Sequence, residues 1–367
     1  MKSKLRSLAL VVTSLAALLS SFAIAQDTAP AKGPTAKVVR PELVPIADVV
    51  DLPCVLLLGD TVSVGYTLPT RKLLDGKANV HRNAITTALK EPPPSKPTTN
   101  KTSKGFRVFT CGHSFHVWIV PLLSEMAIYA GITDHQIAGR SSIGGSMVMK
   151  HWDVPDDKNT AKQLLNEGKV DVLTLSPIWL PDEGIENFAK LAFEHNPDVR
   201  ITVQEYWLPN DEYNPVYPLD TKKKLDHNAT TIPALRDAQD RYDYDIDAHV
   251  RAINKKLGKD ALVTVPVGKA VVALRERIIA GECPGIAEQS ELFRDNWGHP
   301  TQPIMALAGY CHFAVIYKRS PVGLPRPAIL TRNPAWDEKL NRLLQELAWE
   351  AVTKHPMSGV TLGAPSK

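Results

Sequence analysis

Short apolar segments alternate with longer helical patterns from residue 106 onward. The segments that predict strands lie at 106–111, 134–139, 170–176, 199–207 and 261–267. The segments that predict helices lie at 115–131, 161–168, 182–197, 232–258, 268–280, 302–318 and 335–354. Mainly apolar strands separated by helices indicate a parallel sheet covered on both faces. Because crossovers between parallel strands are right-handed, the pattern predicts a three-layer, doubly wound (flavodoxin-like) α/β fold.

A smaller unit precedes this pattern. The stretch "VLLLGDTVSVGYTLPTRKLL" (55–74) predicts a buried strand, a sharp turn and an amphipathic helix. The segment 90–105, with four prolines and almost no apolar side chains, predicts a linker after it. Because a unit this small cannot form an independent core, we expect residues 48–89 to pack on the main domain. That domain spans 106–330, followed by a C-terminal helix and tail at 331–367.

The N-terminus has the pattern of a secretory signal. Residues 1–25 contain three cations, a long apolar run and the small residues Ala23 and Ala25 at its end. The pattern predicts cleavage before Gln26, leaving a flexible tether at 26–47; an uncleaved membrane anchor is the alternative. Cleavage lowers the formal net charge from +4 to +1, which argues against a nucleic-acid partner. We therefore expect an exported protein, periplasmic or secreted, without stable membrane insertion.

Two similar turns are candidates for presenting a nucleophile. The sequences "LLLGDTVSV" and "VFTCGHSFH" align without a gap, so that Thr61 matches Ser114. Ser114 follows the first strand of the ordered domain, whereas Thr61 is followed by the proline-rich segment. A serine hydroxyl after a strand is positioned for nucleophilic attack, and amides at the start of the following helix can bind an oxyanion. We assign the nucleophile to Ser114 and keep Thr61 as the alternative; a helix N-cap would be the structural explanation of Ser114.

An acid and a histidine share one loop near the end of the domain. Asp295 and His299 lie after the last predicted strand, before a helix that we expect to be amphipathic. A carboxylate can orient an imidazole from such a position, and the imidazole can then accept a serine proton. The alternative is a turn-capping Asp295 and a surface His299. The pair and Ser114 both lie outside the carboxyl ends of strands, where doubly wound sheets bind ligands.

These motifs resemble the SGNH (GDSL-type) hydrolase superfamily. The likeness covers roughly 106–325, and 53–82 resembles the family's first block a second time. The resemblance implies a Ser-His-Asp triad of Ser114, His299 and Asp295 that hydrolyses ester bonds, for example acetyl or acyl groups on carbohydrate. Asp295 and His299 are separated by three residues, whereas the family normally has two.

The resemblance also predicts an oxyanion hole, with one departure. In "GRSSIGGSMVMKHW" the matching glycine is Gly145, with Gly144 adjacent, and its amide would act together with that of Ser114. The family's third block ends a strand with an oxyanion asparagine, but here Ser176 and its neighbours occupy that place. Because one such donor contributes about 100- to 1000-fold in turnover, either Gln204 replaces it or the protein is slow. A catalytically weak or inactive binding protein for carbohydrate or cell envelope is therefore the second hypothesis.

Other side chains suggest pocket residues rather than cofactors. We expect His113 and Trp207 to line the pocket, and the insertion 208–233 to overhang it, with its tyrosines as an aromatic platform or as a solvated loop. No acidic or cysteine ligand accompanies the histidines at a familiar spacing, so we expect neither a metal nor another cofactor. Four separated cysteines leave both reduced thiols and one disulfide open. The sequence does not predict an oligomeric state.

Overall fold

The computed structural model describes residues 46, 49–50, 52–57, 67–82, 104–214 and 224–361. The chain divides into two compact units, Met1–Thr98 and Thr99–Lys367. In the first unit, β1 (Cys54–Leu57) pairs in parallel with β2 (Asn79–Arg82), and α2 (Thr67–Leu73) connects them. Sequence analysis missed β2. Thr61 lies outside the described residues, and the packing of this unit on the main domain stays a prediction.

The second unit contains a five-stranded sheet in which every neighbouring pair is parallel. Its strands, in the spatial order β4-β3-β5-β6-β7, are β4 (Gln136–Ser142), β3 (Arg107–Gly112), β5 (Val172–Leu175), β6 (Arg200–Glu205) and β7 (Leu262–Pro266). This is the flavodoxin-like order, so the predicted doubly wound α/β fold is confirmed. The connections leave in opposite directions from β3 and β5, and the edge between these two strands is therefore the switch point where ligands bind.

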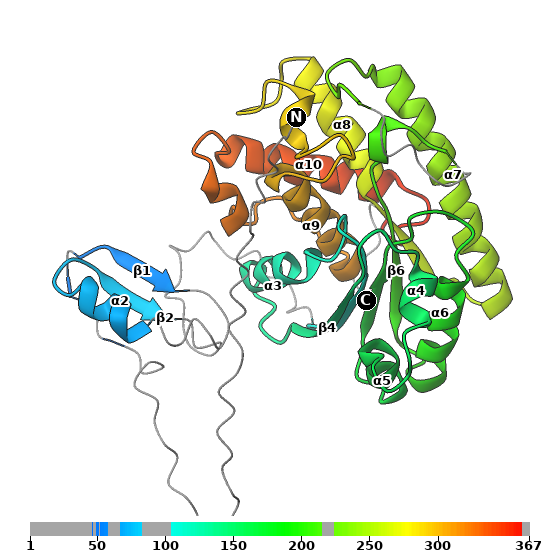
Figure 1. Cartoon of the computed structure of the whole chain (residues 1–367). Coiled ribbons are helices and arrows are strands. Elements are labelled where there is room, and N and C mark those ends of the chain that lie inside the picture. The colour runs from blue at the N-terminus through cyan, green and yellow to red at the C-terminus, as the bar shows by residue number, and fades with distance from the viewer. Residues whose placement is uncertain are drawn as a thin grey trace, which may run out of the picture. The chain divides into compact units, whose positions relative to one another are not determined.

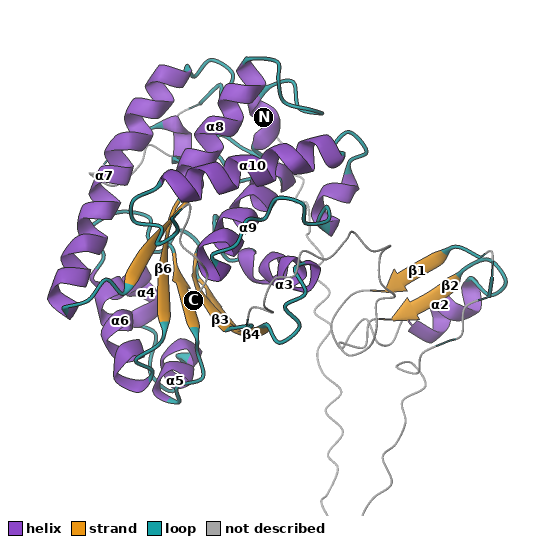
Figure 2. Cartoon of the chain, turned by 180° about the vertical axis from the view of Figure 1, so that it is seen from behind, coloured by secondary structure: helices purple, strands orange, loops and turns teal. Residues whose placement is uncertain are grey.

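Helices cover both faces of the sheet (Figures 1 and 2). On one side, α4 (Val148–Trp152) and α5 (Thr160–Asn166) pack on α6 (Glu183–His195), and α7 (Ile232–Leu257) lies alongside β6 and β7. On the other side, α9 (Gln302–Tyr317) packs against α3 (Ile119–Tyr129), α8 (Val267–Ile279) and α10 (Glu338–Lys354). Short 3₁₀ helices lie at η2 (Pro209–Asp211), η3 (Gln289–Leu292) and η4 (Ala328–Arg332). The predicted C-terminal helix thus belongs to the same compact unit as the sheet.

Helix α9 corrects one expectation. We expected an amphipathic helix, but the helix is buried over almost its whole circumference, with only Gln302 and Met305 partly accessible. Its apolar side chains face α3, α8 and α10 at once, which explains why its sequence shows no polar stripe. In α10, by contrast, Leu340, Leu344 and Leu347 form a buried stripe. None of the described helices combines the length and apolarity that a membrane crossing requires.

Three cysteines lie in the core of the second unit. The thiols of Cys111, Cys283 and Cys311 are free and buried. Burial raises the pKa of the Cys283 thiol to about 11, so at neutral pH it is an uncharged side chain rather than a nucleophile. Among the described cysteine side chains, the reduced form is therefore the one observed.

Candidate active site

Ser114 lies at the switch point, in the turn that follows β3. Gly112 is the last residue of the strand, and glycine fits there because the backbone passes close to a buried ring: a Cβ at this position would lie 2.4 Å from His116 Nδ1. The next residues form turns, and α3 begins only at Ile119, four residues later than predicted. Trp118 fixes the turn by donating its indole N–H to the carbonyl oxygen of Ser114 at 2.9 Å. The helix-cap explanation of Ser114 is wrong, because the residue before α3 is Trp118.

The structure brings Ser114, His299 and Asp295 together. The Ser114 Oγ lies 2.9 Å from His299 Nε2, and His299 Nδ1 lies 2.7 Å from Asp295 Oδ2. Because the carboxylate only accepts hydrogen bonds, the ring proton lies on Nδ1, and the Nε2 lone pair faces the serine hydroxyl. Partial burial opposes ionisation of Asp295, but hydrogen bonds from the amide and ring of His299 hold its pKa below the ordinary value. The arrangement can move a proton from Ser114 to His299.

The loop that carries the acid and the base is a tight turn. Asp295 Oδ1 accepts the amides of Trp297 and His299 at 3.0 and 3.1 Å, which accommodates the three-residue spacing. Gly298 adopts φ +85°, a conformation that favours glycine. The loop is closed by a bond from the Arg294 amide to the His299 carbonyl oxygen at 2.8 Å. Asp295 is therefore both a turn cap and the partner of the imidazole.

A cavity of about 260 Å³ opens in front of the serine hydroxyl. Its walls combine the reactive groups with apolar and aromatic side chains: His113, Ser114, Phe115, Gly145, Ile178, Trp179, Tyr206, Pro209, Trp297 and His299. Asp, Glu, Lys and Arg do not occur among these lining residues. Phe115 also contacts the His299 ring edge-on, with centroids 5.2 Å apart. Such a cavity fits an uncharged group next to the Ser114 hydroxyl.

Gly145 lies in this cavity wall, whereas Gly144 does not. Gly145 adopts φ +56°, and a Cβ there would meet nothing within 4 Å, so the backbone conformation alone favours glycine. Among the hydrogen bonds of the described residues, none uses the amide of Ser114 or of Gly145. Two free amides at the cavity can bind the oxygen of a tetrahedral intermediate.

A buried histidine supports the loop that holds Gly145. The Ser146 hydroxyl donates to the Ile143 carbonyl oxygen at 2.9 Å and accepts from His151 Nε2 at 2.9 Å. His151 Nδ1 in turn accepts from the Ser141 hydroxyl at 2.7 Å. Burial lowers the pKa of His151 to about 4, so the ring is neutral and this chain of donors and acceptors is complete. Sequence reasoning missed this support, because neither residue type nor spacing marks it.

The expected replacement for the oxyanion asparagine is wrong. Gln204 is fully buried, donates to the Phe115 carbonyl oxygen at 3.0 Å and accepts from His312 Nε2 at 2.9 Å. Its amide therefore supports a residue of the cavity wall and does not itself line the cavity. Ser176, in the asparagine position, is also fully buried and lies 3.2 Å from His113 Nε2. Burial lowers the pKa of His113 to about 3, so this wall of the cavity is uncharged.

Two aromatic expectations also change. Trp207 lies behind the cavity: it is buried, stacks on Phe115 with centroids 4.7 Å apart and donates to the Gly298 carbonyl oxygen at 2.8 Å. Tyr213 bonds to Asp245, so it does not form a sugar platform with Trp207. The aromatic side chains that line the cavity, Phe115, Trp179, Tyr206 and Trp297, all lie outside the insertion.

Metal binding has no candidate among the described side chains. No group of three or more His, Cys, Asp or Glu residues in the described ranges is arranged to hold an ion. Four histidines of the second unit bond to hydroxyl groups instead: His113 to Ser176, His116 to Thr174, His151 to two serines and His135 to Tyr317.

Comparisons with known proteins give remote structural similarity. No family model and no curated protein matches the chain. One similar structure, a DUF4886 family protein from Bacteroides uniformis, has 15% identity, covers 71% of this chain and 98% of that chain, and has a TM-score of 0.45. A provisionally assigned SGNH hydrolase from Slackia heliotrinireducens has 12% identity, 57% and 97% coverage and a TM-score of 0.34. The polysaccharide biosynthesis enzyme WcbI has 16% identity, 61% and 73% coverage and a TM-score of 0.33.

Proposed function

We propose that this protein is an exported serine hydrolase that cleaves ester bonds. The observation that carries the proposal is the continuous hydrogen-bonded line from the Ser114 hydroxyl through His299 to Asp295 at the edge of an open cavity. The proposed export, to the periplasm or out of the cell, rests on the signal-like sequence of residues 1–25.

The proposed reaction proceeds in two steps. The Ser114 oxygen attacks the ester carbonyl carbon while His299 Nε2 takes the hydroxyl proton, and Asp295 stabilises the imidazolium. The amides of Ser114 and Gly145 bind the oxyanion. Collapse of the intermediate breaks the ester C–O bond, and His299 returns the proton to the leaving alcohol. Water then attacks the acyl-enzyme by the same route and releases the acid.

The cavity limits the substrate. Because no lining residue carries a formal charge apart from a protonated histidine, the group beside the nucleophile should be uncharged. The volume of about 260 Å³ exceeds what an acetyl group fills, since one water occupies about 30 Å³ of liquid. A larger acyl group or a neutral sugar ring, both compatible with an acylated carbohydrate, would use the apolar and aromatic walls.

A fluorophosphonate probe and a Ser114→Ala variant test the proposal. We expect the wild-type protein to be labelled at Ser114 and to hydrolyse nitrophenyl esters, and the variant to do neither. A parallel Thr61→Ala variant separates the two candidate nucleophiles, and we expect it to be labelled normally. Labelling that survives in Ser114→Ala would refute the assignment.

One observation favours a second function, a binding protein that has lost efficient catalysis. The Ser176 hydroxyl, which follows β5 in the asparagine position, is buried and lies against His113 rather than in the cavity. An oxyanion hole of two amides without a side-chain donor would be weaker by about 2.7–4 kcal/mol. A wild-type protein that binds neutral oligosaccharides but is neither labelled nor active would support this alternative.

A further inference from the structure

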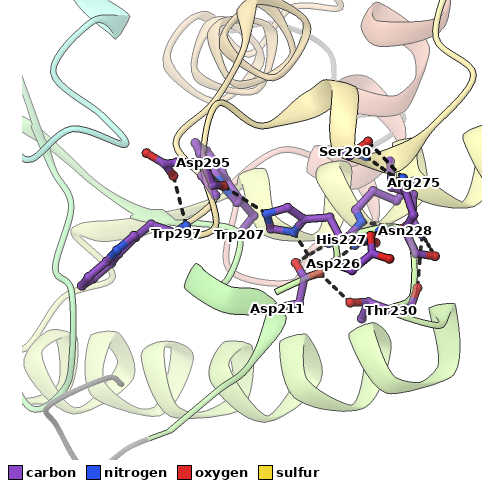
Figure 3. A network of polar contacts seen from close by, with 12 residues as sticks. Trp207, Asp211, Asp226, His227, Asn228, Thr230, Arg275, Ser290, Asp295 and Trp297 are labelled. Atoms are coloured by element: carbon purple, nitrogen blue, oxygen red, sulfur yellow. Dashed lines mark hydrogen bonds and ion pairs between the residues drawn. The ribbon is translucent and has the colours of Figure 1, made fainter. Parts of the chain in front are cut away.

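A buried polar cluster outside the cavity reaches the main chain of Asp295 (Figure 3). It consists of Asp211, at the end of η2, His227, beyond the undescribed part of the insertion, and Arg275, in α8. We call it the Asp211–His227–Arg275 cluster. The triad does not use any of these side chains directly, and they come from three separate parts of the chain.

Arg275 and Asp211 form the fixed base of the cluster. The guanidinium donates to both oxygens of the Asp211 carboxylate, at 2.5 and 2.8 Å, and both side chains are almost fully buried. Arg275 also donates to the His227 carbonyl oxygen at 3.0 Å and to Gln289 Oε1 at 2.6 Å. Burial alone would raise the pKa of Asp211, but the bonds from His227 and Arg275 lower it to about 2, so it is ionised. A bidentate pair of this kind holds a defined geometry.

The His227 ring links this base to the catalytic loop. Its Nδ1 lies 3.1 Å from Asp211 Oδ2, and its Nε2 lies 3.2 Å from the carbonyl oxygen of Asp295. Carboxylate and carbonyl oxygens only accept, so a ring nitrogen that carries a proton donates it to the oxygen that it faces. The ring also packs on Phe293, with centroids 4.1 Å apart, at the start of the same loop. Asp211 therefore holds one edge of the His227 ring, and the other edge contacts the carbonyl oxygen of Asp295.

Asp295 needs such support because burial does not hold it. Its side chain is 43% exposed and that of His299 is 30% exposed. The Asp295 carbonyl oxygen accepts two bonds, one within the loop from the Gly298 amide at 3.1 Å and one from His227. The second is the only one of the two that ties Asp295 to a different part of the fold. A displacement near 1 Å at a catalytic group can cost about 100-fold in rate.

We propose that His227 is a positioning residue for the Asp295–His299 pair, oriented by Asp211 and Arg275. The proposal rests on the proposed function of Ser114. It gives the insertion a role that differs from both expectations of the sequence analysis, the aromatic platform and the solvated loop. Through His227, the insertion then supports catalysis from behind the loop.

The test compares His227→Phe with His227→Gln. The first keeps the ring contact with Phe293 but cannot donate, whereas the second retains an N–H donor. We expect His227→Phe to lower kcat for a nitrophenyl ester about 10- to 100-fold with KM within about 2-fold, and His227→Gln to recover part of the loss. Ser290→Ala is the matched control, because this partly buried residue contacts Asn228 and Glu288 but neither His227 nor Asp295.

A spectroscopic readout separates positioning from general stability. The proton between His299 Nδ1 and Asp295 should give a downfield proton resonance in the wild type, which we expect to be lost or broadened in His227→Phe and retained in Ser290→Ala. Wild-type kcat and an unchanged resonance in His227→Phe would overturn the proposal. Should that variant not fold, unchanged kcat and resonance in both His227→Gln and Asp211→Asn would overturn it equally. A wild type without labelling or activity refutes the proposed function instead, and the resonance alone then decides the positioning role.

Discussion

Replacing His151 by phenylalanine should show how much the hydrogen bonds that support the Gly145 loop contribute to the free energy of unfolding. The substitution keeps an aromatic ring of similar size but removes the acceptor for Ser141 and the donor for Ser146. Because His151 is almost completely buried, no water replaces these bonds at the ring itself. Each polar group left without a partner costs about 1–3 kcal/mol, and the Ser141 hydroxyl is partly accessible, so we expect a loss of about 2 kcal/mol at pH 7.

The pH dependence gives a sharper test of the same variant. Burial lowers the pKa of His151 from 6.5 to about 4, so the unfolded chain binds a proton in this window before the folded protein does. The free energy of unfolding that depends on neutral His151 is present above pH 6.5 and is lost as the pH falls to 4, by about 3 kcal/mol in total. The variant lacks this pH-dependent contribution to the free energy of unfolding. The stability gap between wild type and His151→Phe should therefore close or reverse near pH 4.

Urea denaturation followed by circular dichroism at pH 7 and pH 4 measures this gap. His195→Phe is the control, because it replaces an exposed histidine on α6 that takes no part in the hydrogen bonds of the Gly145 loop. We also expect the kcat of His151→Phe to fall by about 10- to 100-fold, since the Gly145 amide loses its support. A stability gap for His151→Phe that does not change between pH 7 and pH 4 would refute the inference that His151 is held neutral.

Three other substitutions test the surroundings of the site. Gln204→Leu should lower the free energy of unfolding by about 2–4 kcal/mol, because two buried groups lose their partner; urea titration showing a change under about 0.5 kcal/mol would contradict this. Burial raises the pKa of Asp243 to about 9, with Glu205 adding to the shift, so stability from this group is lost as the pH rises toward 9. In Asp243→Asn, the free energy of unfolding should fall less steeply between pH 5 and pH 9 in the same assay. An equally steep fall would contradict the raised pKa of Asp243 beside Glu205. Gly145→Ala should cost only about 1–2 kcal/mol, since its Cβ meets open space; a loss above 3 kcal/mol in thermal unfolding would indicate a filled site.

The sheet could be predicted because each strand is marked by its own residues. Strands buried on both faces need nearly continuous apolar sequence, and the stretch around Leu173 has it. The first strand after the linker was equally clear, and with it the place of Ser114 at a carboxyl end. The short helix α4 and strand β2 were missed, because four or five residues carry too little periodicity. The polar face expected for α9 was wrong, since the sequence did not show that three helices surround it.

The candidate site was predictable to different degrees. Asp295 and His299 share one short loop, so their pairing depends on local turn geometry that the sequence partly encodes. Gln204 was assigned to the site from its place near a strand end, but strand alternation alone did not show that His312 would bind its amide. Support from His151 and His227 could not be predicted, because these contacts join residues whose separation along the chain has no regular period.

The sequence by itself determined the order of strands and helices, the turn that carries Ser114, and the loop that carries Asp295 and His299. These features arise from local propensity and from apolar periodicity, which act over a few residues. Only the tertiary structure decided that the Ser114 hydroxyl meets His299 across 185 residues. It also decided that Gln204 bonds to the backbone of Phe115 in the cavity wall, and that an arginine–aspartate pair holds the His227 ring behind Asp295. Such contacts depend on the packing of distant segments, and one chain's residue pattern does not specify which distant side chains will meet.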